Sequence, residues 1–336
     1  MSYHEPFLFR FNKHIIQVDN FTIQIKNTIK FLTHYHTDHF QGINLNDHVY
    51  CSQITAQLLL ANKKAKPIIL NSPIDLNGLL ITPISANHCP GSVMFLFEEL
   101  QTRKIVLFTG DFKYDLNQSL CICWGILQGL IDILILDTTY IQQKQFISQQ
   151  YAIIQGVNYL RQHFNHDNDK ILFNSYIVGK ERILLAIASA LDIKFYATNK
   201  KRNQSLKIIF SDKFSDFFTE EDNNLGTIII AKSDSQKKQY FSKYSKFNKI
   251  FMIEPTGWVK KFTTYQDKNY PQIIHIHIPY TEHCDSQELK NFVNMIKPKQ
   301  IISILAKNMY HNNKIIQQLS TQSYQSASIS SSINYI

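Results

Sequence analysis

Short β-branched apolar runs recur along the chain, and each of them ends close to a polar or charged residue. They are "IKFLT" before His34, "LLITPIS" before Asn87, "KIVLFT" before Gly110, "IDILIL" before Asp137 and "IIHIHIP" before Tyr280. Runs of this length and composition are typical of buried strands. The pattern therefore predicts an α/β protein whose histidines and carboxylates lie just past strand ends.

Helical periodicity is clearest in two stretches, residues 180–191 ("KERILLAIASAL") and residues 285–296. The apolar face of the second stretch is formed by Leu289, Phe292, Val293 and Ile296. Asp285 followed by Glu288 has the pattern of a capping box, and Pro298 marks the end of this helix.

The middle of the chain differs in composition, since it begins Gln-rich and continues with helical patterns and Lys-rich runs. We therefore expect residues 146–252 to form an inserted α/β domain. Residues 1–145 and 253–316 should fold together as one bipartite domain, because candidate ligands are scattered over both parts. Residues 317–336 are Ser/Gln-rich with few large apolar residues, and we expect a disordered tail there.

The composition changes this picture in only a few respects. A chain of 336 residues with 44% hydrophobic residues can bury real cores, and its net charge of +9 favours polyanionic partners. We find no long apolar stretch and no signal-peptide pattern, which favours a soluble intracellular protein without a membrane partner. The five cysteines contain no C-x-x-C pair, as expected in a reducing compartment.

The densest chemistry lies in "HYHTDH", residues 34–39. His34 and His36 are two positions apart, so an extended or looped backbone aims both side chains the same way, and Asp38 with His39 begins the next predicted helix. Imidazoles and a carboxylate together suit Zn²⁺, and the lack of nearby thiolates argues against a closed structural site. The motif therefore indicates an open, catalytic metal site.

Further candidate ligands follow later strands, namely His88, Asp111 and His283. From about Asp19 to Pro298 the ordered motifs resemble the metallo-β-lactamase fold. Within it they resemble the β-CASP nucleases, most closely the DNA cross-link repair branch that includes Artemis and Apollo. The motifs that carry this resemblance are "FLTHYHTDHFQGI", "ANHCPGSVMFLFE", "LFTGDFKY", "LDTTY", "VGKER", "EPTGW" and "IPYTEHCDSQELKNFV".

The resemblance implies an αββα metallo-β-lactamase sandwich with an inserted β-CASP α/β cap, and one or two zinc ions bound in the sandwich. The ligands of the first zinc ion would be His34, His36, His88 and Asp111. The ligands of the second would be Asp38, His39, His283 and the same Asp111, which would bridge the two ions. Two such cations can stabilise both the attacking and the leaving oxygen of a phosphodiester, and water bound to them ionises near neutral pH. Asp137 would orient a ligating imidazole. The catalytic residues would thus be Asp38, Asp111, Asp137 and His283.

The stretch "NSYIVGKER" contains a Gly-Lys pair but lacks the earlier glycine and the following Ser/Thr of a P-loop. A lysine beside a helix N-terminus can instead bind a phosphate group. The resemblance implies that a terminal DNA phosphate docks here, and the substrate-binding residues would be Ser175, Tyr176, Gly179 and Lys180. Ile177 stands where the family usually has serine, which would weaken directional hydrogen bonding to that phosphate.

Several other residues have simpler interpretations. His275 and His277 imitate an H-x-H pair, but they lie inside a strand pattern where the family has no ligand, so we do not expect them to bind metal. We expect the basic run at 199–202 ("NKKR") to be a solvated loop. Ile229 stands where many relatives carry histidine. An apolar core contact is favoured for Tyr240, Tyr244 and Phe247.

We therefore expect a zinc-dependent DNA nuclease, a monomeric 5′-to-3′ exonuclease that acts on single or frayed strands and prefers a 5′-phosphate. Its place would be the nucleus, in interstrand cross-link or double-strand break repair, with recruitment by other repair proteins. Three alternatives stay open. An RNA-processing β-CASP nuclease differs in "HCPGSVM", "LDTTY" and "IPYTEH". A small-molecule hydrolase needs neither the inserted domain nor the positive charge, and an inactive scaffold would not need an intact ligand set.

Overall fold

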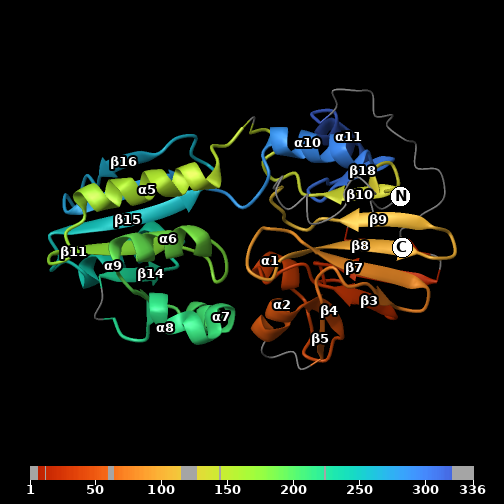
Figure 1. Cartoon of the computed structure of the whole chain (residues 1–336), viewed down its shortest axis with the longest axis horizontal. Coiled ribbons are helices and arrows are strands. Elements are labelled where there is room, and N and C mark those ends of the chain that lie inside the picture. The colour runs from red at the N-terminus through yellow and green to blue at the C-terminus, as the bar shows by residue number, and fades with distance from the viewer. Residues whose placement is uncertain are drawn as a thin grey trace. The chain divides into compact units, whose positions relative to one another are not determined.

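The computed structural model describes residues 7–11, 13–59, 64–114, 127–143, 145–222 and 225–319 (Figure 1). The chain divides into two compact units. The first unit runs from the N-terminal part of the chain to Gln145 and resumes at Glu282, and the second runs from Phe146 to Thr281. In the part of the chain that is described, no helix has the length and apolar character needed to cross a membrane.

The second unit extends further along the chain than the expected inserted domain, because residues 253–281 belong to it. The reason is the pairing of β15 (Lys249–Thr256), which lies in parallel between β11 (Asp169–Asn174) and β17 (Ile273–Pro279). The apolar run before Tyr280 is therefore a strand of the second unit. Of the predicted tail, residues 320–336 lie outside the described residues.

The first unit contains two sheets. The strand order of the first sheet is β1 (Leu8–Phe11), β2 (His14–Val18), β3 (Thr28–Phe31), β4 (Val49–Ser52), β5 (Ala65–Ile68). The strand order of the second sheet is β18 (Gln300–Ser303), β10 (Ile133–Leu136), β9 (Lys104–Phe108), β8 (Val93–Glu99), β7 (Leu79–Ser85), β6 (Ile74–Asp75). Its helices are α1 (Thr37–Phe40), α2 (Gln53–Leu58), α10 (Ser286–Ile296) and α11 (Met309–Ile316).

These two sheets pack face to face through a core of aromatic and branched residues. Phe31 of the first sheet contacts Phe95 and Phe97 of the second at ring-centroid distances of 5.2 and 5.0 Å. The outer face of the second sheet packs against α10 and α11, and Phe40 of α1 and Ala56 of α2 pack with Val49 on the first sheet. This layering confirms the predicted αββα sandwich.

The second unit is a single sheet covered on both faces. Its strand order is β13 (Phe218–Thr219), β12 (Phe195–Ala197), β14 (Gly226–Ile229), β11, β15, β17, β16 (Thr263–Gln266). All pairs are parallel except β16 with β17. Its helices are α5 (Gln149–His163), α6 (Glu181–Leu191), α7 (Lys200–Phe210), η1 (Ser211–Lys213), α8 (Phe214–Phe217) and α9 (Asp234–Lys243). One face packs on α5, α6 and α7, and the other on α9, which gives the near-continuous apolar strands of a parallel sheet.

The predicted helices are present almost to the residue. The stretch 180–191 forms α6, and 285–296 forms α10, whose apolar face is buried. The predicted capping box is confirmed, because the Glu288 amide donates to Asp285 Oδ1 at 2.8 Å and the Asp285 amide donates to Glu288 Oε2 at 2.9 Å. The expected core contacts of Tyr240, Tyr244 and Phe247 are also present.

Candidate metal centre

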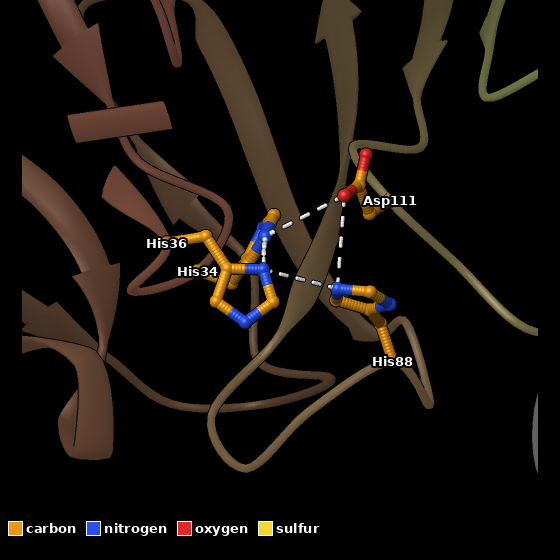
Figure 2. Close-up of side chains that lie close together, drawn as sticks. All are labelled: His34, His36, His88 and Asp111. Atoms are coloured by element: carbon orange, nitrogen blue, oxygen red, sulfur yellow. Dashed lines mark hydrogen bonds and ion pairs between the residues drawn. The ribbon is translucent and has the colours of Figure 1, made fainter. Parts of the chain in front are cut away.

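Loops that follow three different strand ends bring four side chains of the first unit together (Figure 2). His34 follows β3, His88 lies between β7 and β8, and Asp111 follows β9. His36 Nδ1 lies 3.0 Å from His34 Nε2 and 3.3 Å from His88 Nε2. Asp111 Oδ2 lies 3.7 Å from His34 Nε2 and 3.6 Å from His88 Nε2. The structure thus brings together the four residues expected to hold the first zinc ion.

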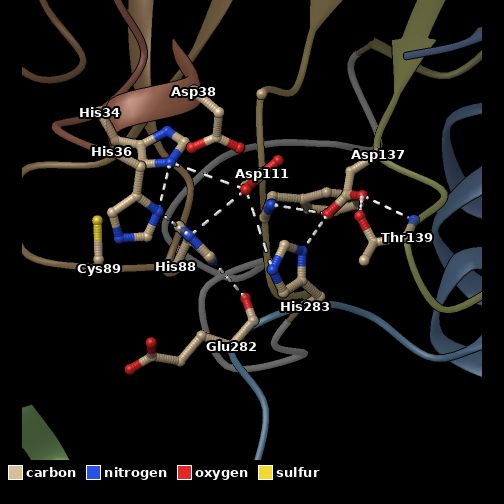
Figure 3. Close-up of polar contacts among 12 residues, drawn as sticks. His34, His36, Asp38, His88, Cys89, Asp111, Asp137, Thr139, Glu282 and His283 are labelled. Carbon is tan, nitrogen blue, oxygen red and sulfur yellow. Dashed lines mark hydrogen bonds and ion pairs between the residues drawn. The ribbon is translucent and has the colours of Figure 1, made fainter. Parts of the chain in front are cut away.

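Asp111 also faces a second set of side chains (Figure 3). Its Oδ2 lies 3.4 Å from His39 Nε2 and 3.9 Å from His283 Nε2. Asp38 begins the short helix α1, and its Oδ2 is 3.7 Å from His39 Nε2, although its side chain is 82% exposed. A single carboxylate therefore stands between the two sets of expected ligands.

Four of these imidazoles are held through Nδ1, which leaves Nε2 aimed at Asp111. His88 Nδ1 donates to the Glu282 carbonyl at 2.9 Å, and His283 Nδ1 donates to Asp137 Oδ2 at 2.8 Å. His39 Nδ1 lies 2.9 Å from Asp19 Oδ2, and His34 Nδ1 lies 2.9 Å from Thr33 Oγ1. Partners of this kind fix the tautomer and orientation of metal-ligating histidines. Asp137, expected to orient a ligating imidazole, thus contacts His283 directly.

The charges of the site fit a cation. Burial lowers the pKa of His34 and of His88, so both imidazoles are neutral and offer lone pairs. Burial would raise the pKa of Asp111, but the neighbouring His39 and His283 outweigh it and hold that pKa well below its usual range. Neutral imidazole nitrogens and a carboxylate oxygen that converge on one another are electron-pair donors for a divalent cation. The nitrogen and oxygen donors suit zinc and related divalent metals.

Asp19 and Thr33 support this site, and the sequence analysis did not identify them. Asp19 is 1% exposed and accepts hydrogen bonds from the Thr33 amide at 2.7 Å and from Thr33 Oγ1 at 2.6 Å. Asp19 thereby orients the Thr33 hydroxyl, which accepts the hydrogen bond from His34 Nδ1. The same carboxylate also holds His39 through its Nδ1. Asp19 directly follows β2, so the pattern of carboxylates after strand ends was a signal that could have found it.

Gly110, next to Asp111, shows why a glycine precedes the central carboxylate. It has a φ of +53°, and a Cβ at this position would lie 2.7 Å from Thr33 Oγ1. Only glycine allows the loop after β9 to approach Thr33 this closely without strain.

The pH dependence of the metal-free protein should report on His34 and His88. Because their folded pKa values lie below 6.5, the unfolded chain binds more protons in acid, and stability should fall as the pH drops below that value. We expect a loss of up to about 1.4 kcal/mol per pH unit for each of the two histidines. Thermal unfolding of chelator-treated protein from about pH 6.5 to 5 measures this.

His39 affects the pH dependence of stability in the opposite direction to His34 and His88. Burial would lower its pKa, but Asp111 and Asp19 raise it overall, so its contribution is present below pH 6.5 and is lost as the pH rises through its folded pKa. It therefore cannot produce the loss in acid. A melting temperature that stays constant below pH 6.5 would contradict the assignment of His34 and His88 as buried neutral ligands.

The residues expected to bind phosphate all lie in the second unit, in the loop between β11 and α6. Ser175 is buried and its Oγ donates to the Gly179 carbonyl at 3.2 Å, whereas Tyr176 is 63% exposed. Gly179 has a φ of +110°. Lys180 is the N-cap of α6, and its Nζ lies 5.2 Å from the centre of the Tyr280 ring. The Gly179 amide donates to Glu181 Oε1 at 2.8 Å, so this part of the helix N-terminus already holds a carboxylate. Ile229 is buried in the apolar cluster with α9.

The expectation of a solvated loop at 199–202 is wrong, because Asn199 caps α7 and Arg202 is completely buried. Arg202 donates to Glu181 Oε1 at 2.6 Å and to the carbonyl groups of Ile177 at 2.9 Å and Gly179 at 3.2 Å. The phosphate-loop candidates are therefore held by an arginine from a neighbouring helix. The sequence pattern that could have revealed this burial is the spacing of Arg202 and Leu206. They are four residues apart and therefore lie on the same, buried face of α7.

Replacing Arg202 by methionine should destabilise the protein by about 3–5 kcal/mol, because Glu181 would remain buried without its cationic partner. Urea unfolding of the variant measures this. In the double variant Arg202→Met/Glu181→Gln most of the loss should be regained, since the amide oxygen can still accept from Gly179. A single variant within about 0.5 kcal/mol of the parent would show that the pair does not hold this loop.

Comparisons with known proteins identify the family. The family model described as DNA repair metallo-beta-lactamase matches residues 215–309. The chain is 31% identical over 294 residues to the DNA cross-link repair 1A protein of Homo sapiens, covering 82% of this chain and 28% of the human protein. It is 28% identical over 295 residues to the DNA cross-link repair protein SNM1 of Arabidopsis thaliana, covering 81% of this chain and 60% of that protein. It is 29% identical over 289 residues to the 5′ exonuclease Apollo of Gallus gallus, covering 83% of this chain and 59% of that protein.

The chain thus spans less than two thirds of the length of each of these relatives. Among solved structures, a protein of unknown function from Enterococcus faecalis V583 is similar with a TM-score of 0.58 and 13% identity, over 89% of this chain and 79% of that one. This likeness concerns the fold alone. Together with the ordered strand-end motifs and the αββα layering, the comparisons show that the chain belongs to the DNA repair metallo-β-lactamase family, among the β-CASP proteins that include the cross-link repair proteins and Apollo.

Proposed function

We propose that this chain is a zinc-dependent DNA nuclease that hydrolyses phosphodiesters from the 5′ end of a strand, as part of cross-link or double-strand break repair in the nucleus. The observation that carries the proposal is the cluster of His34, His36, His88 and Asp111, whose ligand atoms all lie within 4.8 Å of one another. The similarity to the human DNA cross-link repair 1A protein and to the chicken 5′ exonuclease Apollo supports DNA as the substrate. We further propose a monomer that other repair proteins recruit.

A divalent metal is implied by the family, and zinc is our proposal for its identity because the donor set contains imidazoles and carboxylates without a thiolate. His34, His36, His88 and Asp111 would hold the first ion, and Asp38, His39 and His283 would hold a second with Asp111. When bound, such ions supply a Lewis acid and an activated water for attack on phosphorus. This proposal makes Asp38, Asp111 and His283 groups that lie at the reacting atoms.

The residues of the chain then have separate tasks. The Asp111 carboxylate keeps its charge in the buried site, because its neighbouring histidines lower its pKa. Asp137 accepts a hydrogen bond from His283 Nδ1, and His283 Nε2 faces Asp111. Asp19 does the same for His39, and the Glu282 carbonyl for His88. Their shared effect is a set of ligand atoms oriented before any substrate arrives.

We propose that Lys180 attracts a terminal phosphate of the strand, with Ser175, Tyr176 and Gly179 shaping its loop. Because Glu181 already accepts from the Gly179 amide, the attraction must come from the lysine charge rather than from that amide. A preference for a 5′-phosphate over a 5′-hydroxyl should therefore fall in Lys180→Ala. It should rise in Ile177→Ser, where one added neutral hydrogen bond is worth about 0.5–1.5 kcal/mol.

Initial rates on strands that differ only in this terminal group measure the preference. Lys194→Ala is a matched control, since Lys194 is an exposed lysine of the same unit and lies outside the loop. The control should keep the preference of the parent protein. An unchanged preference in Lys180→Ala would remove Lys180 from the proposed phosphate contact without touching the metal centre.

Digestion of end-labelled strands tests the proposed function itself. Matched DNA and RNA strands, labelled at either end, should give stepwise shortening of DNA from the 5′ end and slower cleavage of RNA. Raising the salt concentration should slow the reaction, because a basic protein holds a strand partly by releasing counterions. Internal cuts that do not depend on the terminal group would replace the exonuclease by an endonuclease. Preferential cleavage of the RNA strand would favour an RNA-processing role.

A further inference from the structure

A second cluster of possible metal ligands lies in the second unit, on β15 and β17, and shares no residue with the centre described above. Successive residues of a strand point to opposite faces, and here Ile274, Ile276 and Ile278 of β17 pack with α5 and α6. The opposite face of β15 and β17 begins as an apolar surface with Ile250, Met252 and Ile273. Towards the carboxyl ends of the same two strands it continues with Glu254, His275 and His277.

These three side chains converge. Glu254 lies opposite His277 in the parallel register of β15 and β17, and its Oε2 is 3.8 Å from His277 Nε2. Glu254 Oε1 is 4.0 Å from His275 Nδ1. One ligand atom from each of the three residues lies within 4.8 Å of the others.

One ring nitrogen of His275 faces this cluster without a hydrogen-bond partner among the described residues. Its Nε2 donates to Asp267 Oδ2 at 3.1 Å, and Tyr265 stacks on the ring at a centroid distance of 4.7 Å. His275 is 5% exposed, and its buried Nδ1 has no hydrogen-bond partner among the described residues. A buried imidazole normally satisfies both nitrogens. Here His275 Nδ1 and Glu254 Oε1 face each other across 4.0 Å, too far apart for a hydrogen bond.

We propose that Glu254, His275 and His277 bind a zinc-class divalent cation, with Asp267 as the carboxylate that orients His275. A histidine whose second nitrogen donates to a carboxylate is the usual arrangement at protein zinc sites. Two imidazoles and one carboxylate match the ligands of known zinc sites that keep a fourth position open. Burial lowers the pKa of His277, which favours the neutral imidazole that a metal ligand needs.

Lys237 of α9 competes with the cation for this site. Its Nζ lies 2.7 Å from Glu254 Oε1, so the ammonium group neutralises the carboxylate when no metal is bound. Binding of a cation requires Lys237 to withdraw, and its side chain is 20% exposed and can reach solvent. Removing this positive charge should therefore strengthen metal binding by about tenfold or more, because like charges at close range repel.

The experiment measures zinc stoichiometry in a variant whose first centre is disabled by His36→Ala and Asp111→Ala. The protein is dialysed to equilibrium against about 10 µM free zinc, which fills sites with micromolar dissociation constants. Elemental analysis then counts the bound ions. Adding His277→Gln or Glu254→Gln to this background should remove one zinc ion per chain. Adding Lys237→Ala should retain that ion and lower the zinc concentration needed for half occupancy.

His163→Gln is the matched control, because His163 is an exposed histidine of the same unit that lies outside the cluster. It should leave the zinc count unchanged. Circular dichroism of each variant excludes loss of folding, and His277→Gln in the otherwise intact chain should keep its DNA hydrolysis while losing one ion. If adding His277→Gln or Glu254→Gln leaves the zinc count unchanged, the proposal is overturned. It is also overturned if His163→Gln loses one zinc ion per chain.

Discussion

Replacing Asp111 by alanine should lower DNA hydrolysis by several orders of magnitude. The Oδ2 atom of Asp111 lies between 3.4 and 3.9 Å from the Nε2 atoms of four histidines, namely His34, His39, His88 and His283. Removing it takes away the negative charge that two adjacent cations would share, and two-metal catalysis depends on the positions of both. Initial rates on a 5′-phosphorylated DNA strand measure the loss.

The Asp111→Asn variant distinguishes the loss of negative charge from the loss of side-chain volume, because asparagine is uncharged and has nearly the same volume as aspartate. It should lose activity almost as severely as the alanine variant, and bound metal should fall in both. Asp75→Asn serves as the control, since Asp75 is an exposed carboxylate of the same unit that accepts from the Gly78 amide and lies outside the metal centre. Rates near those of the parent protein in Asp111→Ala would show that hydrolysis does not use this centre.

Replacing Asp137 by asparagine should lower activity by about 10–100-fold, as losses of orienting partners do. Asp137 is 3% exposed and receives four hydrogen bonds, from the Phe112 amide, the Thr139 amide, Thr139 Oγ1 and His283 Nδ1. Asparagine has only one side-chain oxygen, so at least one of these donors would face an amide NH₂ group. His283 would then lose the partner that aims its Nε2 at Asp111.

Thr139→Val is the matched comparison, because it removes one neutral donor and leaves the Asp137 carboxylate beside His283. It should cost less activity than Asp137→Asn. A further readout is the zinc concentration needed for half-maximal rate, which should rise in Asp137→Asn. If the two variants behave alike, Asp137 serves the local fold rather than His283.

The convergence of the metal centre could be predicted because its ligands share one position in the fold. His34 and Asp111 each follow a strand that the apolar pattern predicted, β3 of the first sheet and β9 of the second. The two packed sheets of one sandwich bring these strand ends together. His283 follows β17, the strand after which the chain leaves the second unit. Its place beside Asp111 therefore depends on the point at which the chain re-enters the first unit, at Glu282. Only the resemblance to a family indicated that return, since periodicity carries no information on it.

Other features depend on tertiary contacts that no local pattern encodes. The boundary of the inserted domain was wrong because β15 and β17 look like any buried strands. Only the pairing of β15 with β11, and of β17 with β15, assigns them to the second unit. Arg202 was misread because a basic run is usually solvated, whereas here the buried Glu181 makes an ion pair with one of its residues. His275 and His277 appeared to be ordinary strand residues, and Glu254, which faces them, lies on a different strand.

The central claim is that the metal centre of the first unit hydrolyses DNA, and one measurement tests it most directly. Protein stripped of metal with a chelator and then titrated with zinc should recover hydrolysis of a 5′-phosphorylated DNA strand in proportion to the zinc bound. The Asp111→Ala variant, treated in the same way, should recover none. Full activity in the stripped protein, or equal recovery by Asp111→Ala, would contradict the account.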